Sequence, residues 1–290
     1  MTLRVSDITP EDIAAERRRM PRAFAGTLNE RAMRAALWLL FLGFVIECLW
    51  QFDVTPQRLF LGIGGVWKIL RLMVPPQTGG FLPELLGSLA QTLAMAFIGT
   101  LLATLFAVPL GFLAARNVLP NWVLHFGLRR GLDVLRGIDQ LIWALVFVRA
   151  VGLGPLTGIL AIAISDTGTL AKLFSEAIEN VDRKPVDGVR SVGALPFQVL
   201  RYGVVPQVIP VILSQALYFF ESNTRSATIL GIVGAGGIGL ALSERIKANL
   251  WDQVAFVILI ILVTVAVIDM LSRLIRHRLI RGAPSTDRSV

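Results

Sequence analysis

The sequence predicts an all-α membrane protein, a bundle of about six transmembrane helices. Of its 290 residues 54% are hydrophobic and only 17% are charged, and the mean hydropathy is +0.68. An average soluble domain is about 25% charged, and a water-soluble fold of this length could not enclose so much apolar side chain in one core. The arginines, moreover, cluster between the apolar runs, as they do in the loops of membrane proteins.

Six apolar runs are candidates for membrane spans. A helix needs roughly 20 apolar residues to cross the hydrocarbon core. The third run is shorter than this, and the sixth is the most apolar because residues 254–268 hold one hydroxyl and no charge. The expected spans run from about Ala35 to Phe52, Leu86 to Leu113, Ile138 to Val151, Pro155 to Phe174, Val205 to Val233 and Val254 to Leu271.

The arginine-rich segments alternate with segments that hold fewer Lys and Arg, which predicts that both termini are cytoplasmic. Between the first two spans, Gln57 to Val74 mixes apolar residues with three basic ones and stops at Pro75-Pro76. It is expected to be an amphipathic helix at the outer interface, or a segment that dips partly into the bilayer. The predicted organisation is a cytoplasmic segment 1–34, the first span with the interfacial helix 35–85, a core 86–276 and a cytoplasmic tail 277–290.

Several function classes are excluded or weakened. The net charge of +8 is interpreted as loop arginine rather than as a nucleic-acid surface. The chain has no P-loop, no H-E-x-x-H, two histidines and one cysteine, so we expect no catalytic residue, no metal site and no cofactor on this chain. Residues 234–239 match G-x-G-x-x-G, but they follow a membrane helix rather than a strand, so the glycines are expected to permit an unwound turn or close backbone contact.

Polar residues within the apolar runs are costly in lipid and usually face the interior of a bundle. They have two interpretations. In the first they pair structurally, Glu221 with Arg225 along one helix and Arg149 with Asp166 between helices. In the second they line a polar path for a solute, with arginine suited to an anion. The residues concerned are Arg149, Asp166, Glu221, Asn223 and Arg225, with the hydroxyls of Ser88 and Thr92 as further candidates.

The arginine-rich loop near 185–206 is the most specific pattern. Pro185 can start a helix, and Gly193 and Pro196 then break it. The pattern predicts a short helix and a turn that dock a partner, or else a plain connecting loop. The run is Asp187-Gly188-Val189-Arg190-Ser191-Val192-Gly193-Ala194-Leu195-Pro196.

At these residues the chain resembles the membrane permease of a bacterial ABC importer, a family whose loop reads E-A-A, three residues, glycine and a stretch ending in proline. Asp187-Gly188-Val189 stands for the E-A-A, Gly193 for the glycine and Pro206 for the proline. Three further stretches resemble phosphonate permeases: Pro109 to Asn117, Tyr202 to Gln207, and Thr228 to Gly231 with the glycines from Gly234 to Gly239.

The resemblance implies a type I ABC importer permease in the bacterial inner membrane. The implied partners are a second copy of the chain, two ATPase subunits that hold ATP and Mg, and a periplasmic or extracellular binding protein. Asp187 to Pro196 would be the coupling helix, which docks on the ATPase. The expected function is ATP-driven import of phosphonate or a related phosphorus oxyanion, phosphite or phosphate. A self-sufficient secondary transporter or channel for a small anion is the alternative, although no internal repeat is visible.

Overall fold

The computed structural model describes residues 28–118 and 122–281, and within these ranges it holds helices and turns without a β-strand. The all-α prediction is confirmed. The chain divides into two compact units, one up to Leu70 and one from Arg71, and each is described by itself. The predicted organisation with boundaries at 34, 85 and 276 stays a prediction, and most of the expected segment 1–34 lies outside the described residues.

The first unit holds α3 (Leu28–Gln51) and most of α4 (Pro56–Leu72). Ala32–Gln51 is long and apolar enough to cross a membrane, and none of it is buried, as expected for the first span. α4 covers nearly the stretch predicted for the amphipathic helix and ends before Pro75. It has no buried residue, so its apolar side chains are available to lipid or to another surface.

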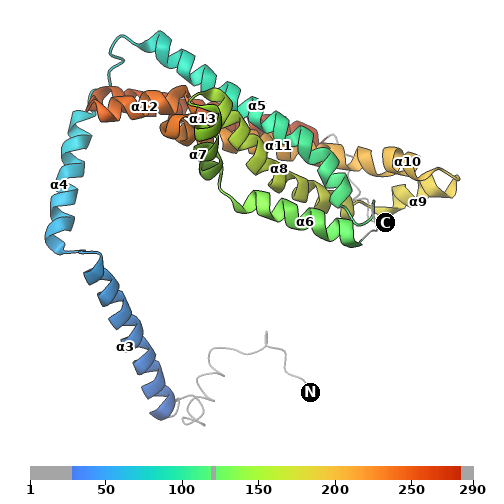
Figure 1. The fold of residues 1–290 in the computed structure, drawn as a ribbon, viewed down its shortest axis with the longest axis horizontal. Coiled ribbons are helices and arrows are strands. Elements are labelled where there is room, and N and C mark those ends of the chain that lie inside the picture. Colours follow the sequence, from blue (N-terminus) through green and yellow to red (C-terminus); the bar gives the residue numbers. More distant parts are fainter. Residues whose placement is uncertain (1–27, 119–121, 282–290) are drawn as a thin grey trace, which may run out of the picture. The chain divides into compact units, whose positions relative to one another are not determined.

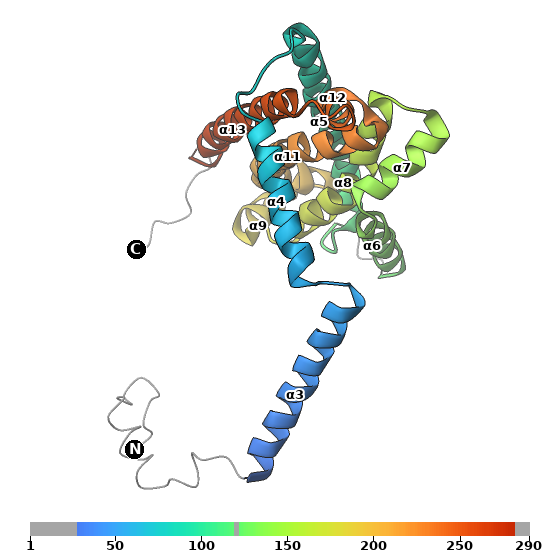
Figure 2. The same ribbon diagram turned by 90° about the vertical axis from the view of Figure 1, so that its left-hand side faces the viewer.

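The second unit is built around α5 (Leu82–Ala114) and α8 (Pro155–Glu179), which lie side by side (Figure 1 and Figure 2). Small residues bring the two backbones together. A Cβ on Gly99 would come within 2.8 Å of the Ile162 side chain, and one on Gly111 equally close to Phe174. Close packing through small residues is how helices associate in a bilayer, where burial of apolar surface against lipid brings no gain.

Along α8 lie a helix at the predicted third span and one further helix before it. α6 (Trp122–Gly137) occupies what was expected to be a loop, and α7 (Gln140–Val151) has only 12 residues. α6 forms because its leucines recur on one face and pack with the core around α8, while its arginines occupy other faces. α7 then packs along the amino-terminal half of α8. A helix at Ile138 to Val151 is thus confirmed, but with 12 residues α7 is shorter than the stretches long enough to cross a membrane.

Beyond α8 come α9 (Arg183–Ser191) and α10 (Pro196–Val199), then a π-helical turn at Leu200–Val204 and α11 (Val205–Leu230). A second π-helical turn, Gly231–Ala235, leads to α12 (Gly237–Lys247) and α13 (Trp251–Arg281). α9 and α10 lie at one end of this unit and α12 at the other (Figure 1). Among the described residues, five stretches are long and apolar enough to cross a membrane: Ala32–Gln51, Leu82–Ala114, Pro155–Glu179, Pro196–Ala235 and Trp251–Arg276.

The G-x-G-x-x-G stretch is an unwound turn, as expected. Gly234, Gly236 and Gly237 have φ values of 110°, 84° and 70°, a region that residues with a Cβ rarely adopt. A Cβ on Gly239 would overlap the carbonyl oxygen of Thr228. The glycines therefore fold the chain back so that α12 contacts the end of α11, and no strand precedes them in the described chain to make a dinucleotide site.

Candidate functional site

Four helices, α5, α7, α8 and α11, contribute side chains to a buried polar cluster at the middle of α8. Asn223 Nδ2 donates to Asp166 Oδ2 at 2.5 Å and to Thr100 Oγ1 at 2.9 Å. Gln140 Nε2 donates to Asp166 Oδ1 at 2.8 Å and to Asn223 Oδ1 at 3.1 Å. Asp166 and Asn223 are 4% and 2% exposed. Each polar group is satisfied by another, which is what keeps such groups tolerable inside a bundle.

The polar run of α11 divides between two sides of the helix. Asn223 faces this buried cluster, whereas the neighbouring charges face α13. Glu221 Oε2 accepts from Arg276 Nη2 at 2.6 Å, and Arg225 Nη1 pairs with Asp269 at 3.2 Å. The Glu221–Arg225 pair expected along the helix is present at 3.9 Å, but the shorter contacts are those between helices.

The other structural pairing expected from the sequence, Arg149 with Asp166, is wrong. Asp166 is bound by two amide groups instead, and Arg149 is exposed near the carboxyl end of α7. Asp166 lies beside the opposite, amino end of α7, because it contacts the first residue of that helix, Gln140. A role for Arg149 in a solute path stays a prediction.

The hydroxyl of Thr92 holds the glycine turn. It donates to the Ser88 carbonyl oxygen at 3.0 Å and accepts from the Ile238 backbone at 2.8 Å. Gln91 Oε1 accepts from the Gly237 backbone at 2.8 Å. Two backbone donors at the start of α12 are thereby satisfied from α5. These contacts assign Thr92 a structural use, and the predicted place of Ser88 and Thr92 on a solute path stays untested.

At the opposite end of the unit, residues 182–207, here called the coupling segment, include the loop near 185–206 that was expected to dock a partner. Asp182 caps α9, and Gly193 ends the following turn with φ 77°. Pro196 was expected to break a helix, but it starts α10 instead. The tip is apolar and open: Val192 is 82% exposed, Leu195 67% and Phe197 70%. An exposed apolar cluster of this kind marks an interaction surface.

The base of the coupling segment is tied to α11. The Asp182 backbone donates to Gln207 Oε1 at 3.0 Å, and Gln207 Nε2 donates to the carbonyl oxygens of Asp182 at 3.2 Å and Gly203 at 2.7 Å. Gly203 also packs against Val186, since a Cβ there would lie 3.1 Å from the Val186 Cα. One glutamine thus joins the start of α9 to the start of α11.

Comparison with known proteins identifies the family. Residues 107–281 match the family described as binding-protein-dependent transport system inner membrane component. The match covers the coupling segment and most of the buried polar cluster. The chain belongs to this family. The resemblance seen in the sequence is confirmed, and the family is one of permeases rather than of enzymes.

Individual proteins agree with the assignment. This permease is 38% identical over 236 residues to the phosphite transport system permease protein PtxC of Stutzerimonas stutzeri, covering 81% of this chain and 85% of that one. It is 37% identical over 268 residues to the phosphate-import permease protein PhnE of Mycolicibacterium smegmatis, covering 92% of this chain and 50% of PhnE. A chain of the MetNI methionine ABC transporter in an inward-facing conformation has the same fold, with a TM-score of 0.60, 19% identity and 70% of this chain covered.

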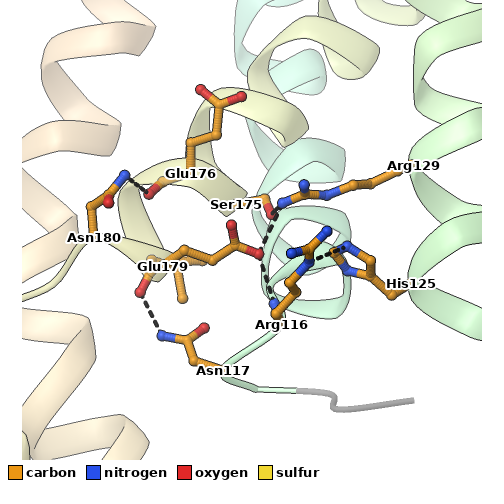
Figure 3. A network of polar contacts seen from close by, with 9 residues as sticks. Arg116, Asn117, His125, Arg129, Ser175, Glu176, Glu179 and Asn180 are labelled. Atoms are coloured by element: carbon orange, nitrogen blue, oxygen red, sulfur yellow. Dashed lines mark hydrogen bonds and ion pairs between the residues drawn. The ribbon is translucent and has the colours of Figure 1, made fainter. Parts of the chain in front are cut away.

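A second polar network in the permease lies near the coupling segment (Figure 3). Glu179 Oε1 accepts from Arg129 Nη2 and from the Arg116 backbone, both at 2.8 Å. Arg116 Nε donates to His125 Nε2 at 3.0 Å, and Asn117 Nδ2 donates to the Ile178 carbonyl oxygen at 2.7 Å. The end of α8 is thus fixed to the end of α5 and to α6, three residues before the coupling segment begins.

Sequence reasoning missed this network and two members of the buried cluster. Thr100 and Gln140 were not singled out because a lone hydroxyl within an apolar helix, or a lone amide at a helix start, has no distinguishing spacing. Arg129 and Arg116 were counted as loop charges. Arg129 could have been found from its place on an amphipathic stretch, because the spacing of the α6 leucines predicts a helix that packs on one face. An arginine on a packed helix is positioned to pair with a particular carboxylate.

Proposed function

We propose that this permease forms the membrane pathway of an ATP-driven importer for a phosphorus oxyanion: phosphonate, phosphite or phosphate. The observation that carries the proposal is the likeness, over most of the chain, to permeases named for phosphite transport and phosphate import. The chain brings no nucleotide site, so ATP and Mg are held by two partner ATPase subunits. A periplasmic or extracellular binding protein delivers the substrate.

The orientation follows from the basic loops and the coupling segment. The end of the second unit that carries α9 and α10 faces the cytoplasm, together with both chain termini. The ATPase contacts the exposed apolar tip at Val192, Leu195 and Phe197. Asp187 and Arg190, 3.9 Å apart on α9, add charges that set the register of this contact. Two copies of the chain, each with one ATPase beneath it, enclose the pathway between them.

Coupling then works as a shift between two arrangements of the same helices. When the ATPases close on ATP, they bind one position of the two tips better than the other. Differential binding of this kind moves the equilibrium between conformations. The hydrogen bonds of Gln207 carry the displacement to α11, and those of Glu179 carry it to α6 and α5. The pathway opens to one side at a time.

The test is to recover and reconstitute the assembly. The tagged permease, purified in mild detergent from cells that express it with its native partners, is expected to bring down a P-loop ATPase, identified by mass spectrometry. Proteoliposomes with the permease, that ATPase and the binding protein are expected to accumulate labelled phosphite, phosphate or methylphosphonate only with ATP. Uptake by the permease alone, driven by an ion gradient, would contradict the proposal.

A further inference from the structure

A polar cavity of about 400 Å³ lies at the break between α6 and α7. Its polar wall consists of Arg136 at the end of α6, Asp139 and Gln140 at the start of α7, Ser165 on α8 and Ser226 on α11. Apolar residues of α7 and α11 complete it. Gln140 belongs both to this wall and to the buried polar cluster, so the cavity adjoins the polar interior of the unit.

The hydroxyl of Ser165 distinguishes the cavity from ordinary packing. Ser165 is 8% exposed, and its hydroxyl makes no hydrogen bond with any residue that the structure describes. The other buried hydroxyls of α8 are all engaged: Thr157 with the Gly152 carbonyl oxygen, Thr167 with that of Ala163, and Ser175 with Arg129. The Ser165 hydroxyl is not sealed within the packing but opens onto the cavity, so it is available to bond a ligand there.

Ser226, which is only partly buried, adds a second hydroxyl from the facing helix. Its hydroxyl also has no hydrogen bond within the described chain, and it lines the same cavity. Hydroxyls on α8 and α11 therefore converge on one space from two sides. Each can donate one hydrogen bond to a ligand and accept others.

The charges of the wall define the ligand. The Arg136 Nε lies 3.7 Å from Asp133, a long contact that leaves the five N–H donors of the guanidinium largely available to an oxyanion. Asp139 caps α7, with Oδ1 accepting from the Leu141 backbone at 2.8 Å. Its carboxylate repels an anion that has lost every proton, but it accepts a hydrogen bond from one that keeps an acidic hydroxyl.

We infer that this cavity binds a partly protonated phosphorus oxyanion during its passage through the permease, an inference that rests on the proposed function. The P–O⁻ oxygens accept from Arg136, Ser165 and Ser226, and the P–OH donates to Asp139. The position suits a transport site, because α6 and α7 are interrupted opposite the middle of α8. Interrupted helices near the bilayer midplane are where transporters commonly hold charged substrates.

The experiment compares hydroxyl deletions in the complete transporter. Wild type, Ser165→Ala/Ser226→Ala and the matched control Ser214→Ala are reconstituted with the ATPase and the binding protein, and uptake of labelled phosphite is measured. Ser214 lies on α11, makes no hydrogen bond in the described chain and does not line the cavity. The double variant is expected to lower kcat/KM for uptake at least about tenfold, because it removes two hydrogen bonds to a charged group.

The outcomes separate the inference from the proposed function. A loss confined to the double variant, with intact dimers by gel filtration and an unchanged thermal midpoint, supports the cavity as a binding site. Wild-type uptake in the double variant overturns the inference and leaves the proposed function standing. An equal loss in Ser214→Ala also overturns it, because the effect would not belong to the cavity. If wild type takes up neither phosphite, phosphate nor methylphosphonate with ATP, both proposals fall.

Discussion

The coupling segment and the buried polar cluster are built in opposite ways. Above its base, the coupling segment takes its shape from residues close in sequence: an Asp182 cap, a left-handed Gly193 and a hydrogen bond from Leu195 to Gln198. Its tip is exposed. The buried cluster is assembled from α5, α7, α8 and α11, and its shortest hydrogen bond joins Asp166 to Asn223, 57 positions away.

The comparison distinguishes an exposed surface, whose side chains are free to bind a partner, from an interior whose polar groups must all remain hydrogen-bonded. Changes at the tip should leave the fold intact and act on the proposed ATPase contact, because the side chains of the tip are exposed. Changes in the cluster leave polar groups unsatisfied between helices, so they act on stability first. The four predictions below test this contrast, from the largest expected effect to the smallest.

Asp166→Ala should be the most damaging substitution. It removes the acceptor for both Gln140 and Asn223, and each buried donor left unsatisfied costs about 1–3 kcal/mol, so we expect a loss of about 2–4 kcal/mol. The thermal midpoint of the detergent-purified protein measures it. Thr169→Ala, on the same helix and without a hydrogen bond in the described chain, is the control and should change little. Equal thermal midpoints in the two variants would contradict a stabilising role for the buried cluster.

Gly193→Arg should have the opposite effect: the protein should fold and lose ATP-driven uptake. A Cβ on Gly193 meets nothing within 4 Å, and φ is 77°, so the backbone strain is about 1–2 kcal/mol. An arginine in the tip should obstruct the proposed ATPase contact, so ATP-driven uptake should fall at least about tenfold. Gly80→Arg is the matched control, since Gly80 has φ 80° and equally open space. Unchanged uptake in Gly193→Arg would count against docking at this tip.

The same contrast explains what the sequence could predict. The coupling segment was predictable because proline, glycine and a capping aspartate act on their immediate neighbours. The long apolar spans were predictable from length alone. The partners of Asp166 were not, because one charged residue in an apolar helix shows that a partner is needed and does not show which one. Arg149 was the wrong choice, since nothing in the sequence places it at the far end of α7 from Asp166.

The interruption between α6 and α7 was missed for a related reason. α6 carries Arg129, Arg130 and Arg136, which by composition indicate a loop. Its leucines nevertheless pack against α8, where a Cβ on Gly168 would lie 2.9 Å from the Leu132 carbonyl oxygen. Whether an arginine-rich stretch packs depends on the surface it meets, and that surface belongs to a distant part of the chain.

Glu179→Gln should affect both stability and uptake, and each less than Asp166→Ala and Gly193→Arg do. The substitution weakens hydrogen bonds from Arg129 and the Arg116 backbone at a site 24% exposed, and we expect a loss of about 1 kcal/mol. If this network also carries motion from the coupling segment, uptake per ATP hydrolysed should fall as well. Glu176→Gln is the matched control. Glu176 lies one turn away, is exposed, and its carboxylate points away from the network (Figure 3). Equal uptake per ATP in both variants would limit Glu179 to a structural role.

Thr92→Val should have the smallest effect, and it decides between two roles for one hydroxyl. The substitution keeps the shape of the side chain and removes the acceptor for the Ile238 backbone, which should lower stability by about 1 kcal/mol. Thr104→Val is the control, because Thr104 bonds only to the Thr100 carbonyl oxygen of its own helix. If Thr92 only holds the glycine turn, the thermal midpoint falls while KM for the transported oxyanion stays at the wild-type value. A raised KM with an unchanged midpoint would instead place Thr92 on the solute path, as the sequence suggested, and would extend that path from the polar interior to the end of the unit at α12.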